Sequence, residues 1–350
     1  MYDFNSIIGE EQLKEKMKAV ANSGKHSHAY LIVGEKRSGK TTLANCFAKA
    51  LQCESEGNKP CGMCLSCMQM DAGNHPDVIT LKTAKEETIG INDIREGLND
   101  DIVIKPYRSE KKIYIIEDAQ KMTRQAQNAL LKTLEEPPSY AVIIMTTTSA
   151  EAMLQTVLSR TIVLPVRPVP DEAIRRYLMK NAEILYYRAD VFTAFARGNL
   201  GKAMDLATSS EFEESKERAV TLLKGIEEKS YSTLYVTAAP FSDKKKASEF
   251  NELMDFIRIW YRDALVYKST GREEGLIFRE EIQYIKKVSK EISYEGFEDI
   301  FKALKKSQAM LRSNVSTETV ADLLLIAVRD CRREPEDKRP ENKESIQKNL

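Results

Sequence analysis

One glycine-rich segment limits the fold of this 350-residue chain more than any other feature. Gly34-Glu-Lys-Arg-Ser-Gly39-Lys40-Thr41 has P-loop spacing, with an apolar strand pattern at Tyr30 to Val33 before it and a helical pattern after it. Glycines let the backbone fold around phosphates, so that its N–H groups and the helix N-terminus face the anion. The segment predicts an α/β domain that binds a phosphate after its first strand. The alternative is a glycine turn without a ligand.

The polar residues of this segment have expected roles at a bound nucleotide. Lys40 would reach the β and γ phosphates, and the Thr41 hydroxyl would hold Mg²⁺. The other P-loop residues expected at the nucleotide are Gly34, Ser38, Gly39 and Thr42. The expected cofactor is therefore ATP or ADP with Mg²⁺.

Two acids, Glu117 and Asp118, follow the strand pattern Lys112 to Ile116. A P-loop needs a carboxylate on a neighbouring strand to hold the Mg²⁺ shell and orient water. Hydrolytic P-loop enzymes of the extended AAA+ type usually read Asp-Glu here, so the order is reversed. Asp118 is one methylene shorter than the usual Glu, and misplacement by about 1 Å can cost about a hundredfold in rate. The pair predicts nucleotide binding with slow hydrolysis. The alternative is that both acids only end a strand and cap the next helix.

Four cysteines form the pattern C-x7-C-x2-C-x2-C at Cys53, Cys61, Cys64 and Cys67, inside a stretch rich in Gly, Pro and Asn. Four thiolates at such separations can close a tetrahedron around Zn²⁺, which leaves no position open for water. The pattern predicts a structural zinc site that staples a polar loop. A redox pair from one C-x2-C and unliganded thiols are the alternatives, and His75 could replace one ligand.

Composition and patterning indicate a multidomain globular protein. Lys+Arg 53 equals Asp+Glu 53, so no bulk charge attracts nucleic acid or an acidic membrane. The apolar runs are too short to span a bilayer and the start has no signal pattern, so we expect a cytoplasmic protein. Strand and helix patterns alternate to about residue 165, and only helical patterns follow, from 171 to 330. The strand candidates are Ala29 to Val33, Val78 to Leu81, Lys112 to Ile116, Ala141 to Thr146 and Thr161 to Leu164.

Several segments together closely resemble the bacterial DNA polymerase III clamp-loader subunits over about residues 4 to 330. Two blocks are highly specific because no generic P-loop enzyme needs both: AsnAlaLeuLeuLysThrLeuGluGluPro, within 126 to 138, and LeuSerArg, at 158 to 160. The remaining segments are HisAlaTyrLeuIle before the P-loop, the cysteine insertion, AsnHisProAsp at 74 to 77 and ThrThrThr at 146 to 148.

The resemblance implies a fold of α/β plus all-α class. It comprises an AAA+ domain with a parallel sheet and a zinc module at about 52–76, then a helical lid, a helical collar domain and a tail. The implied boundaries are 1–168, 169–208, 209–331 and 332–350; the tail is expected to be disordered because it is charged and proline-broken. The family works as a hetero-pentamer of gamma/tau, delta and delta-prime subunits that uses ATP to place the sliding clamp on primed DNA, with no membrane. Clamp and DNA contacts of this chain are expected to be indirect, through the complex.

Within the family, the sequence favours the delta-prime type over the gamma/tau motor, which is the alternative. The length lacks tau's additional C-terminal part, the acids at Glu117 and Asp118 are reversed, and Gly201 stands where motors place a sensor arginine. The resemblance implies that Arg160 acts in trans on the ATP of a neighbouring subunit. Thr146 and Thr147 match the polar sensor of bound phosphate. Their alternatives are a surface salt bridge for Arg160 and a plain strand position for the threonines.

Overall fold

The structure, a computed structural model, describes residues 2–81, 88–243 and 247–332, which fall into two compact units, Met1–Ala207 and Thr208–Leu350. The strands are β1 (Ala29–Val33), β2 (Val78–Leu81), β3 (Lys112–Ile116), β4 (Ala141–Thr147) and β5 (Ile162–Pro165). The first nine α-helices are α1 (Glu11–Ser23), α2 (Lys40–Gln52), α3 (Leu65–Ala72), α4 (Ile91–Ile94), α5 (Arg124–Glu135), α6 (Gln155–Leu158), α7 (Asp171–Asn181), α8 (Tyr186–Ala196) and α9 (Leu200–Thr208). The others are α10 (Glu211–Lys224), α11 (Tyr231–Ala238), α12 (Ala247–Thr270), α13 (Ile282–Glu291), α14 (Tyr294–Arg312) and α15 (Thr317–Asp330).

The five described strands form one parallel sheet in the order β2-β3-β4-β1-β5. β1 pairs with β4 on one side, with Val33 opposite Thr147, and with β5 on the other, with Val33 opposite Pro165. Parallel strands reach the same edge of the sheet with their carboxyl ends. The turns that follow β1, β3 and β4 therefore meet at one edge, and that edge holds the predicted phosphate site.

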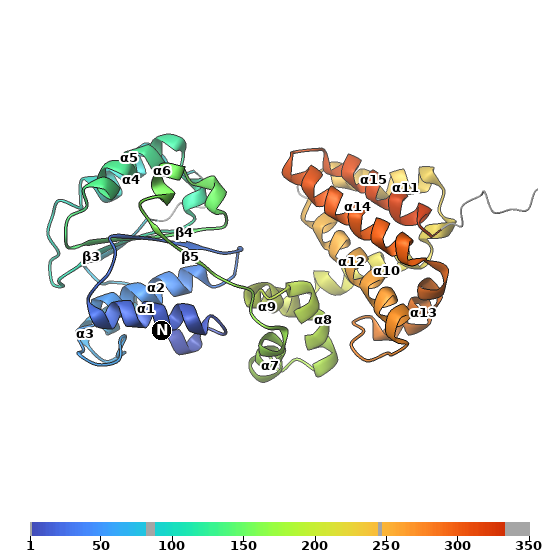
Figure 1. Cartoon of the computed structure of the whole chain (residues 1–350), viewed down its shortest axis with the longest axis horizontal. Coiled ribbons are helices and arrows are strands. Elements are labelled where there is room, and N and C mark those ends of the chain that lie inside the picture. The colour runs from blue at the N-terminus through green and yellow to red at the C-terminus, as the bar shows by residue number, and fades with distance from the viewer. Residues whose placement is uncertain (1, 82–87, 244–246, 333–350) are drawn as a thin grey trace, which may run out of the picture. The chain divides into compact units, whose positions relative to one another are not determined.

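Alternate side chains of each strand point into two separate apolar cores. On β1, Tyr30 and Ile32 pack in the core with α1 and α2, whereas Leu31 packs in the core with α4, α5 and α6. Figure 1 shows these two groups of helices on the two faces of the sheet. Strands that are buried on both faces read as continuous apolar runs. This is why β1, β3 and β4 could be located from sequence.

The described residues of the second unit form helices joined by loops, with no strand among them, and aromatic rings pack in its core. Phe256 stacks on Phe212 with 5.5 Å between ring centroids, and Trp260 meets Phe278 edge-on at 5.5 Å. Trp260 is completely buried. Phe256 and Trp260 of α12 thus belong to the core of this unit.

The expected fold class, α/β followed by all-α, is confirmed. β1, β2 and β3 have the predicted bounds, but β4 continues to Thr147. β5 begins one residue later than expected, because Thr161 still belongs to the preceding turn: its N–H and Oγ1 both bond the carbonyl of Leu158. β5 ends at Pro165, which an edge strand tolerates because one side of the strand needs no donor.

The finer domain boundaries stay predictions. The compact first unit ends at Ala207 and includes α7 and α8, which belong to the expected lid. Of the expected tail 332–350, only Arg332 lies within the described residues, and its guanidinium is buried against Glu227 and Glu291. The lysine run at 244–246 lies outside the described residues. Among those described, no helix has the length and apolarity that crossing a membrane requires.

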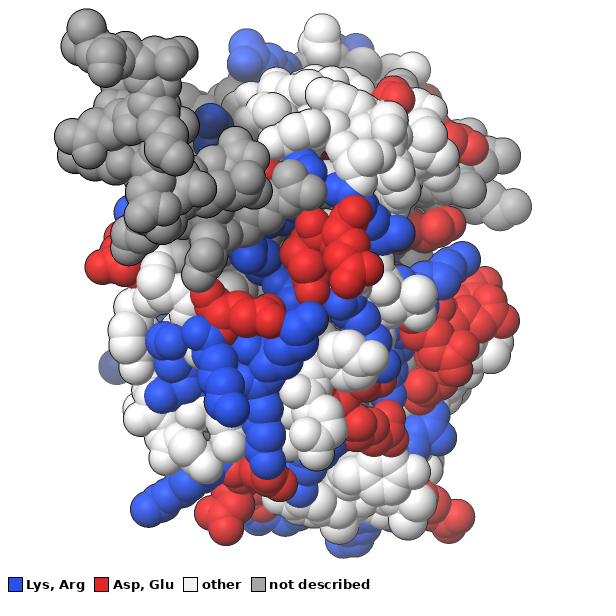
Figure 2. Space-filling model, turned by 90° about the vertical axis from the view of Figure 1, so that its right-hand side faces the viewer, with Lys and Arg blue, Asp and Glu red and all other residues white. Residues whose placement is uncertain are grey.

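Charged side chains of the second unit form ion pairs both between elements and within one helix. Lys224 of α10 meets Glu281 at 2.7 Å, whereas Lys302 and Glu298 pair within α14 at 2.8 Å. Figure 2 shows basic and acidic side chains interspersed over one face of the molecule. On that face, acidic groups interrupt the basic ones, in keeping with the zero net charge.

Candidate functional site

The P-loop connects β1 to α2 at the carboxyl edge of the sheet. Gly39 precedes α2 in the left-handed region, with φ +86°, which glycine adopts without strain. At Gly34, a Cβ atom would lie 2.6 Å from the Ser38 Oγ and 3.0 Å from the Val166 Cβ. The backbone at these two positions therefore depends on glycine, as a phosphate-wrapping turn requires.

Lys40 turns back over this loop. Its Nζ donates to the carbonyl of Glu35 at 3.0 Å, and the side chain is nearly buried. Burial lowers the pKa of Lys40, and the carboxylate of Asp118 opposes that shift. The buried Oγ of Ser38 has no hydrogen-bond partner among the described residues. A cation and an unused hydroxyl in a glycine-rich turn fit the phosphates of a nucleotide.

The predicted acids and threonines meet beside this loop. β4 lies between β1 and β3, so Thr146 and Thr147 stand between the P-loop strand and the strand that ends before Glu117. The N–H of Asp118 donates to the Oγ1 of Thr146 at 3.2 Å. The Oγ1 of Thr147 donates to the carbonyl of Ser149 at 2.9 Å. Thr41 and Thr42 are half-buried in the first turn of α2. One edge of the sheet thus holds every predicted nucleotide residue.

The start of α9 packs on the P-loop backbone, a contact that sequence reasoning missed. Buried Asn199 donates from its side-chain amide to the carbonyl of Lys36 at 2.8 Å. Arg37 forms an ion pair with Asp205 at 2.8 Å. A Cβ atom on Gly201 would lie 2.8 Å from the Arg37 Cβ and closer still to the Arg37 carbonyl oxygen. This packing leaves no room for a larger side chain at position 201.

Arg160 lies at the opposite edge of the sheet from the P-loop. It precedes the amino end of β5, whereas the P-loop follows the carboxyl end of β1, and the two strands are parallel neighbours. At about 3.3 Å per residue, the paired strands separate the two sites by at least about 10 Å. The Arg160 Nη2 forms an ion pair with Glu135 at 2.8 Å, and Nη1 donates to the carbonyl of Thr156 at 3.0 Å. The structure does not bring Arg160 together with the chain's own phosphate site.

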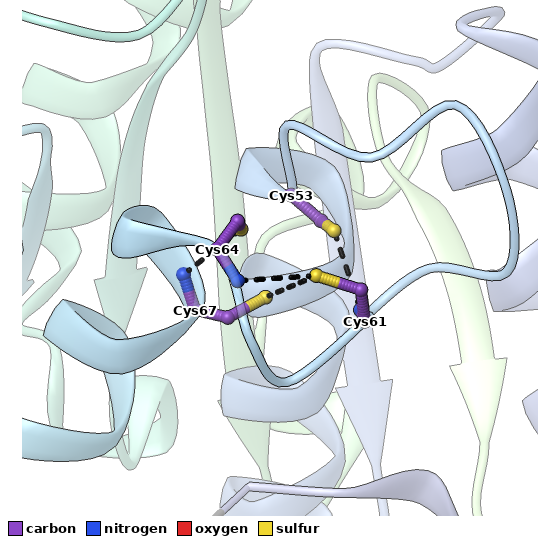
Figure 3. A group of neighbouring side chains, drawn as sticks. All are labelled: Cys53, Cys61, Cys64 and Cys67. Carbon is purple, nitrogen blue, oxygen red and sulfur yellow. Dashed lines mark hydrogen bonds between the residues drawn. The ribbon is translucent and has the colours of Figure 1, made fainter.

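The four predicted cysteines converge between the end of α2 and the start of α3 (Figure 3). Their Sγ atoms all lie within 4.8 Å of one another, and those of Cys61 and Cys67 are 4.0 Å apart. Tetrahedral Zn²⁺ with Zn–S bonds of about 2.3 Å needs sulfurs about 3.8 Å apart. The donor set and its spacing therefore fit zinc.

Backbone N–H groups point at these sulfurs. The Cys61 Sγ accepts from the N–H of Cys64 at 3.3 Å and from that of Met63 at 3.5 Å, and these bonds lower the pKa of Cys61 to about 6. Hydrogen bonds to the charged form stabilise a thiolate, which is the form that binds metal. Local backbone geometry at Cys61 is thus already suited to a metal ligand.

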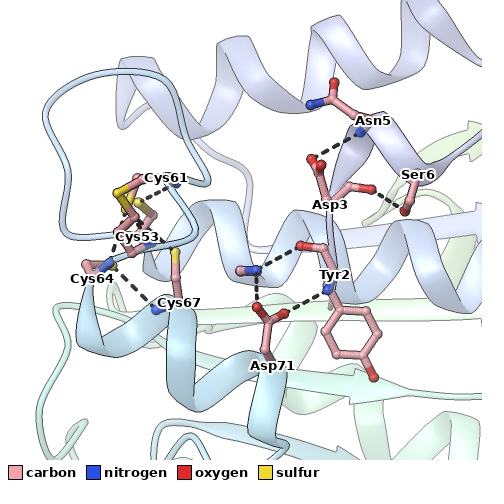
Figure 4. Close-up of polar contacts among 11 residues, drawn as sticks. Tyr2, Asp3, Asn5, Ser6, Cys53, Cys61, Cys64, Cys67 and Asp71 are labelled. Atoms are coloured by element: carbon pink, nitrogen blue, oxygen red, sulfur yellow. Dashed lines mark hydrogen bonds and ion pairs between the residues drawn. The ribbon is translucent and has the colours of Figure 1, made fainter.

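A second polar cluster ties the cysteine module to α2 and to the segment before α1 (Figure 4). Asp71 of α3 forms an ion pair with Lys49 of α2 at 2.7 Å and accepts the N–H of Tyr2 at 2.7 Å. Lys49 also donates to the carbonyl of Tyr2 at 2.9 Å and is buried. The helix that starts at the P-loop is therefore anchored at its other end to the cysteine module.

His75 has a structural role rather than a place among the four sulfurs. Its Nδ1 accepts the N–H of Asp77 at 3.2 Å, so the proton is on Nε2, which faces the Oγ of Ser66 at 2.9 Å. Burial lowers the pKa of His75, which keeps the ring neutral, although Asp77 opposes the shift. The imidazole joins α3 to the start of β2.

Comparisons with known proteins point to one group of proteins. Residues 9–170 match the family model described as DNA polymerase III, delta subunit. The chain is 29% identical to the DNA polymerase III subunit delta' of Bacillus subtilis over 87% of this chain and 91% of that protein. It is 27% identical to the tau subunit of the same organism over 88% of this chain and 58% of that protein.

Among solved structures, a gamma subunit-related protein of Thermotoga maritima matches 91% of this chain and 99% of its own, with 22% identity and a TM-score of 0.44. Residues 9–170 thus match a DNA polymerase III subunit family model, and similarity to the delta' and tau subunits extends over most of the chain.

Proposed function

We propose that this chain is a delta'-type subunit of the DNA polymerase III clamp loader. It braces a five-membered ring with gamma/tau and delta subunits and supplies Arg160 to the ATP site of a neighbour while the ring loads the sliding clamp onto primed DNA. Similarity to a delta' subunit over most of both chains supports this assignment.

The observation that carries the proposal is the position of Arg160. It stands at the sheet edge opposite the chain's own P-loop, and its side chain remains about one-third exposed. An arginine that stabilises the transition state of phosphoryl transfer must contact the transferring group. Arg160 can meet that requirement only at a nucleotide held by another subunit.

Two features of the chain's own pocket support weak turnover. Asp118, rather than the longer Glu, follows Glu117, and its backbone has a positive φ of +52°. Gly201 packs so closely on Arg37 that an arginine at this position has no space while α9 keeps its place. The pocket is therefore assigned a structural role, with ATP or ADP and Mg²⁺ bound through Lys40 and Thr41.

The same proposal assigns structural Zn²⁺ to Cys53, Cys61, Cys64 and Cys67. With four sulfur ligands, the metal would have no open position for a substrate. It would hold the loop between α2 and α3 in place, and this chain's chemistry would proceed without it.

Replacing Arg160 tests the trans role. In a complex reconstituted with gamma/tau and delta subunits of the same organism, Arg160→Ala should lower DNA-dependent ATP hydrolysis on the order of 10³-fold at the served site, with assembly intact. Arg176→Ala, on the exposed face of α7, is the matched control and should leave the rate unchanged. An unchanged rate for Arg160→Ala would remove the trans role.

A gamma/tau-type motor is the second candidate, and the complete P-loop with Lys40 favours it. Steady-state ATP hydrolysis by the purified chain separates the two. The delta'-type assignment expects negligible turnover, whereas a motor would show robust hydrolysis that Lys40→Ala abolishes.

A further inference from the structure

We propose that Glu135 is the positioning residue that orients Arg160; this inference rests on the trans role proposed above. Glu135 ends α5, and Arg160 follows the short helix α6, which packs against α5, so the two side chains come from separate elements. The contact is an ion pair of 2.8 Å between the Arg160 Nη2 and the Glu135 Oε1.

Three contacts together define the plane of the guanidinium. Glu135 holds Nη2, while the carbonyl of Thr156 at 3.0 Å and the Oγ of Ser159 at 3.3 Å both accept from Nη1. A guanidinium has five N–H donors in a rigid fork, so bonds on one side leave donors on the other. Within the described residues Nε makes no hydrogen bond, and the side chain stays about one-third exposed. Arg160 is thus fixed yet accessible to an incoming phosphate.

The position of Glu135 at the C-terminus of α5 also favours its pairing with Arg160. The last turn of a helix carries partial negative charge from its free carbonyls, so an acid there is unfavourable unless a cation lies close. Arg160 provides that cation. The acid in turn limits the rotamers that the long arginine side chain would otherwise explore, which reduces the entropy lost when it docks on a phosphate.

The chain offers a matched control at the next residue. Glu136 has the same chemistry and is exposed, and its side chain forms no ion pair or hydrogen bond with another described residue. Glu135→Gln and Glu136→Gln each remove one negative charge from the same end of α5. A difference between them isolates the contact with Arg160.

The experiment measures kcat and KM for ATP in the reconstituted complex, with clamp and primed DNA present. Glu135→Gln should lower kcat about tenfold, because small misplacements of a catalytic group are costly, and should leave KM within about twofold. Glu136→Gln should match wild type. In an Arg160→Ala background, Glu135→Gln should cause no further loss, since Glu135 acts only through Arg160.

Each other outcome has a distinct meaning. If Arg160→Ala is inert, the trans role itself fails. If Arg160→Ala is severe but Glu135→Gln matches wild type, the trans role stands and the positioning role is overturned. An equal loss of kcat from Glu135→Gln in the wild-type and Arg160→Ala backgrounds would show a purely structural effect. A raised kcat would show that Glu135 holds Arg160 back from the nucleotide. Either result overturns the positioning role. Size-exclusion chromatography of every variant complex confirms that assembly is intact.

Discussion

At the scale of residues, Asp77 shows how one buried carboxylate can organise a loop. It accepts the backbone N–H groups of Ser109 at 2.8 Å and Arg108 at 2.9 Å, and also that of Tyr107. Burial alone would raise the pKa of Asp77, but these three bonds outweigh it and hold the pKa below its ordinary value. The ionised carboxylate therefore fixes the segment before β3, far along the chain from β2.

This arrangement predicts an acid-sensitive loss of stability. The folded pKa of Asp77 lies below the unfolded value of about 3.9, so its contribution is complete above that pH and is lost as the pH falls through the folded pKa. Asp77→Asn should lower the free energy of unfolding by about 2 kcal/mol at pH 7, and this deficit should shrink below pH 4. Urea unfolding followed by circular dichroism measures it. Asp100→Asn, at an exposed acid, is the control; a deficit that is independent of pH would contradict the prediction.

The roles of residues that work together within one short segment could be predicted from sequence. Contacts between residues of distant segments could not. Lys40 and the four cysteines are found from spacing alone, because their chemistry is local in sequence. Glu135 stands inside the block at 126 to 138 and Asn199 lies two residues before Gly201, but nothing in a single sequence says that they touch Arg160 or Lys36. Such contacts depend on how strands and helices pack.

At the scale of elements, α2 links two sites. It begins at Lys40 in the P-loop and ends at Gln52, immediately before Cys53. The strands could be placed closely from sequence because buried parallel strands read as apolar runs. The predicted start of β5 was one residue too early, because Thr161 of the preceding turn is a β-branched residue like those of the strand. The fold of the cysteine module could not be read from its polar loop, since the metal-ligand geometry decides it.

Removal of the proposed Zn²⁺ should loosen the loop between α2 and α3 without unfolding the sheet. We expect about one Zn²⁺ per purified chain, and Cys64→Ser should remove nearly all of it, because three ligands hold zinc far less tightly than four. Metal analysis and limited proteolysis at residues 54–60 check this result. Cys331→Ser should keep the metal, and a zinc content unaffected by Cys64→Ser would contradict the assignment.

At the scale of the whole molecule, the two units can be observed separately. The chain has one tryptophan, Trp260, and it is completely buried in the helical core of the second unit. Its fluorescence therefore reports the unfolding of that unit, whereas hydrogen exchange of β1 and β3 reports the first.

Nucleotide should stabilise only the first unit. With ATP and Mg²⁺ at about 100 times the dissociation constant, the first unit should gain about 2.7 kcal/mol, seen as slower exchange in β1 and β3. The urea midpoint of Trp260 fluorescence should not move. Lys40→Ala should abolish the gain, and an equal shift of the Trp260 transition would mean that the units unfold together.

Arg160 and the P-loop stand at opposite edges of one sheet. Under the proposed trans role, each subunit of this kind would therefore present its arginine to one neighbour and its phosphate site to the other. If the proposed ring of five subunits is open at one point, it has one fewer interface than subunits, so the phosphate site at one end would receive no arginine and the arginine at the other end would meet no nucleotide. A subunit whose own phosphate site hydrolyses little ATP loses least by standing at the end where no neighbour's arginine reaches that site.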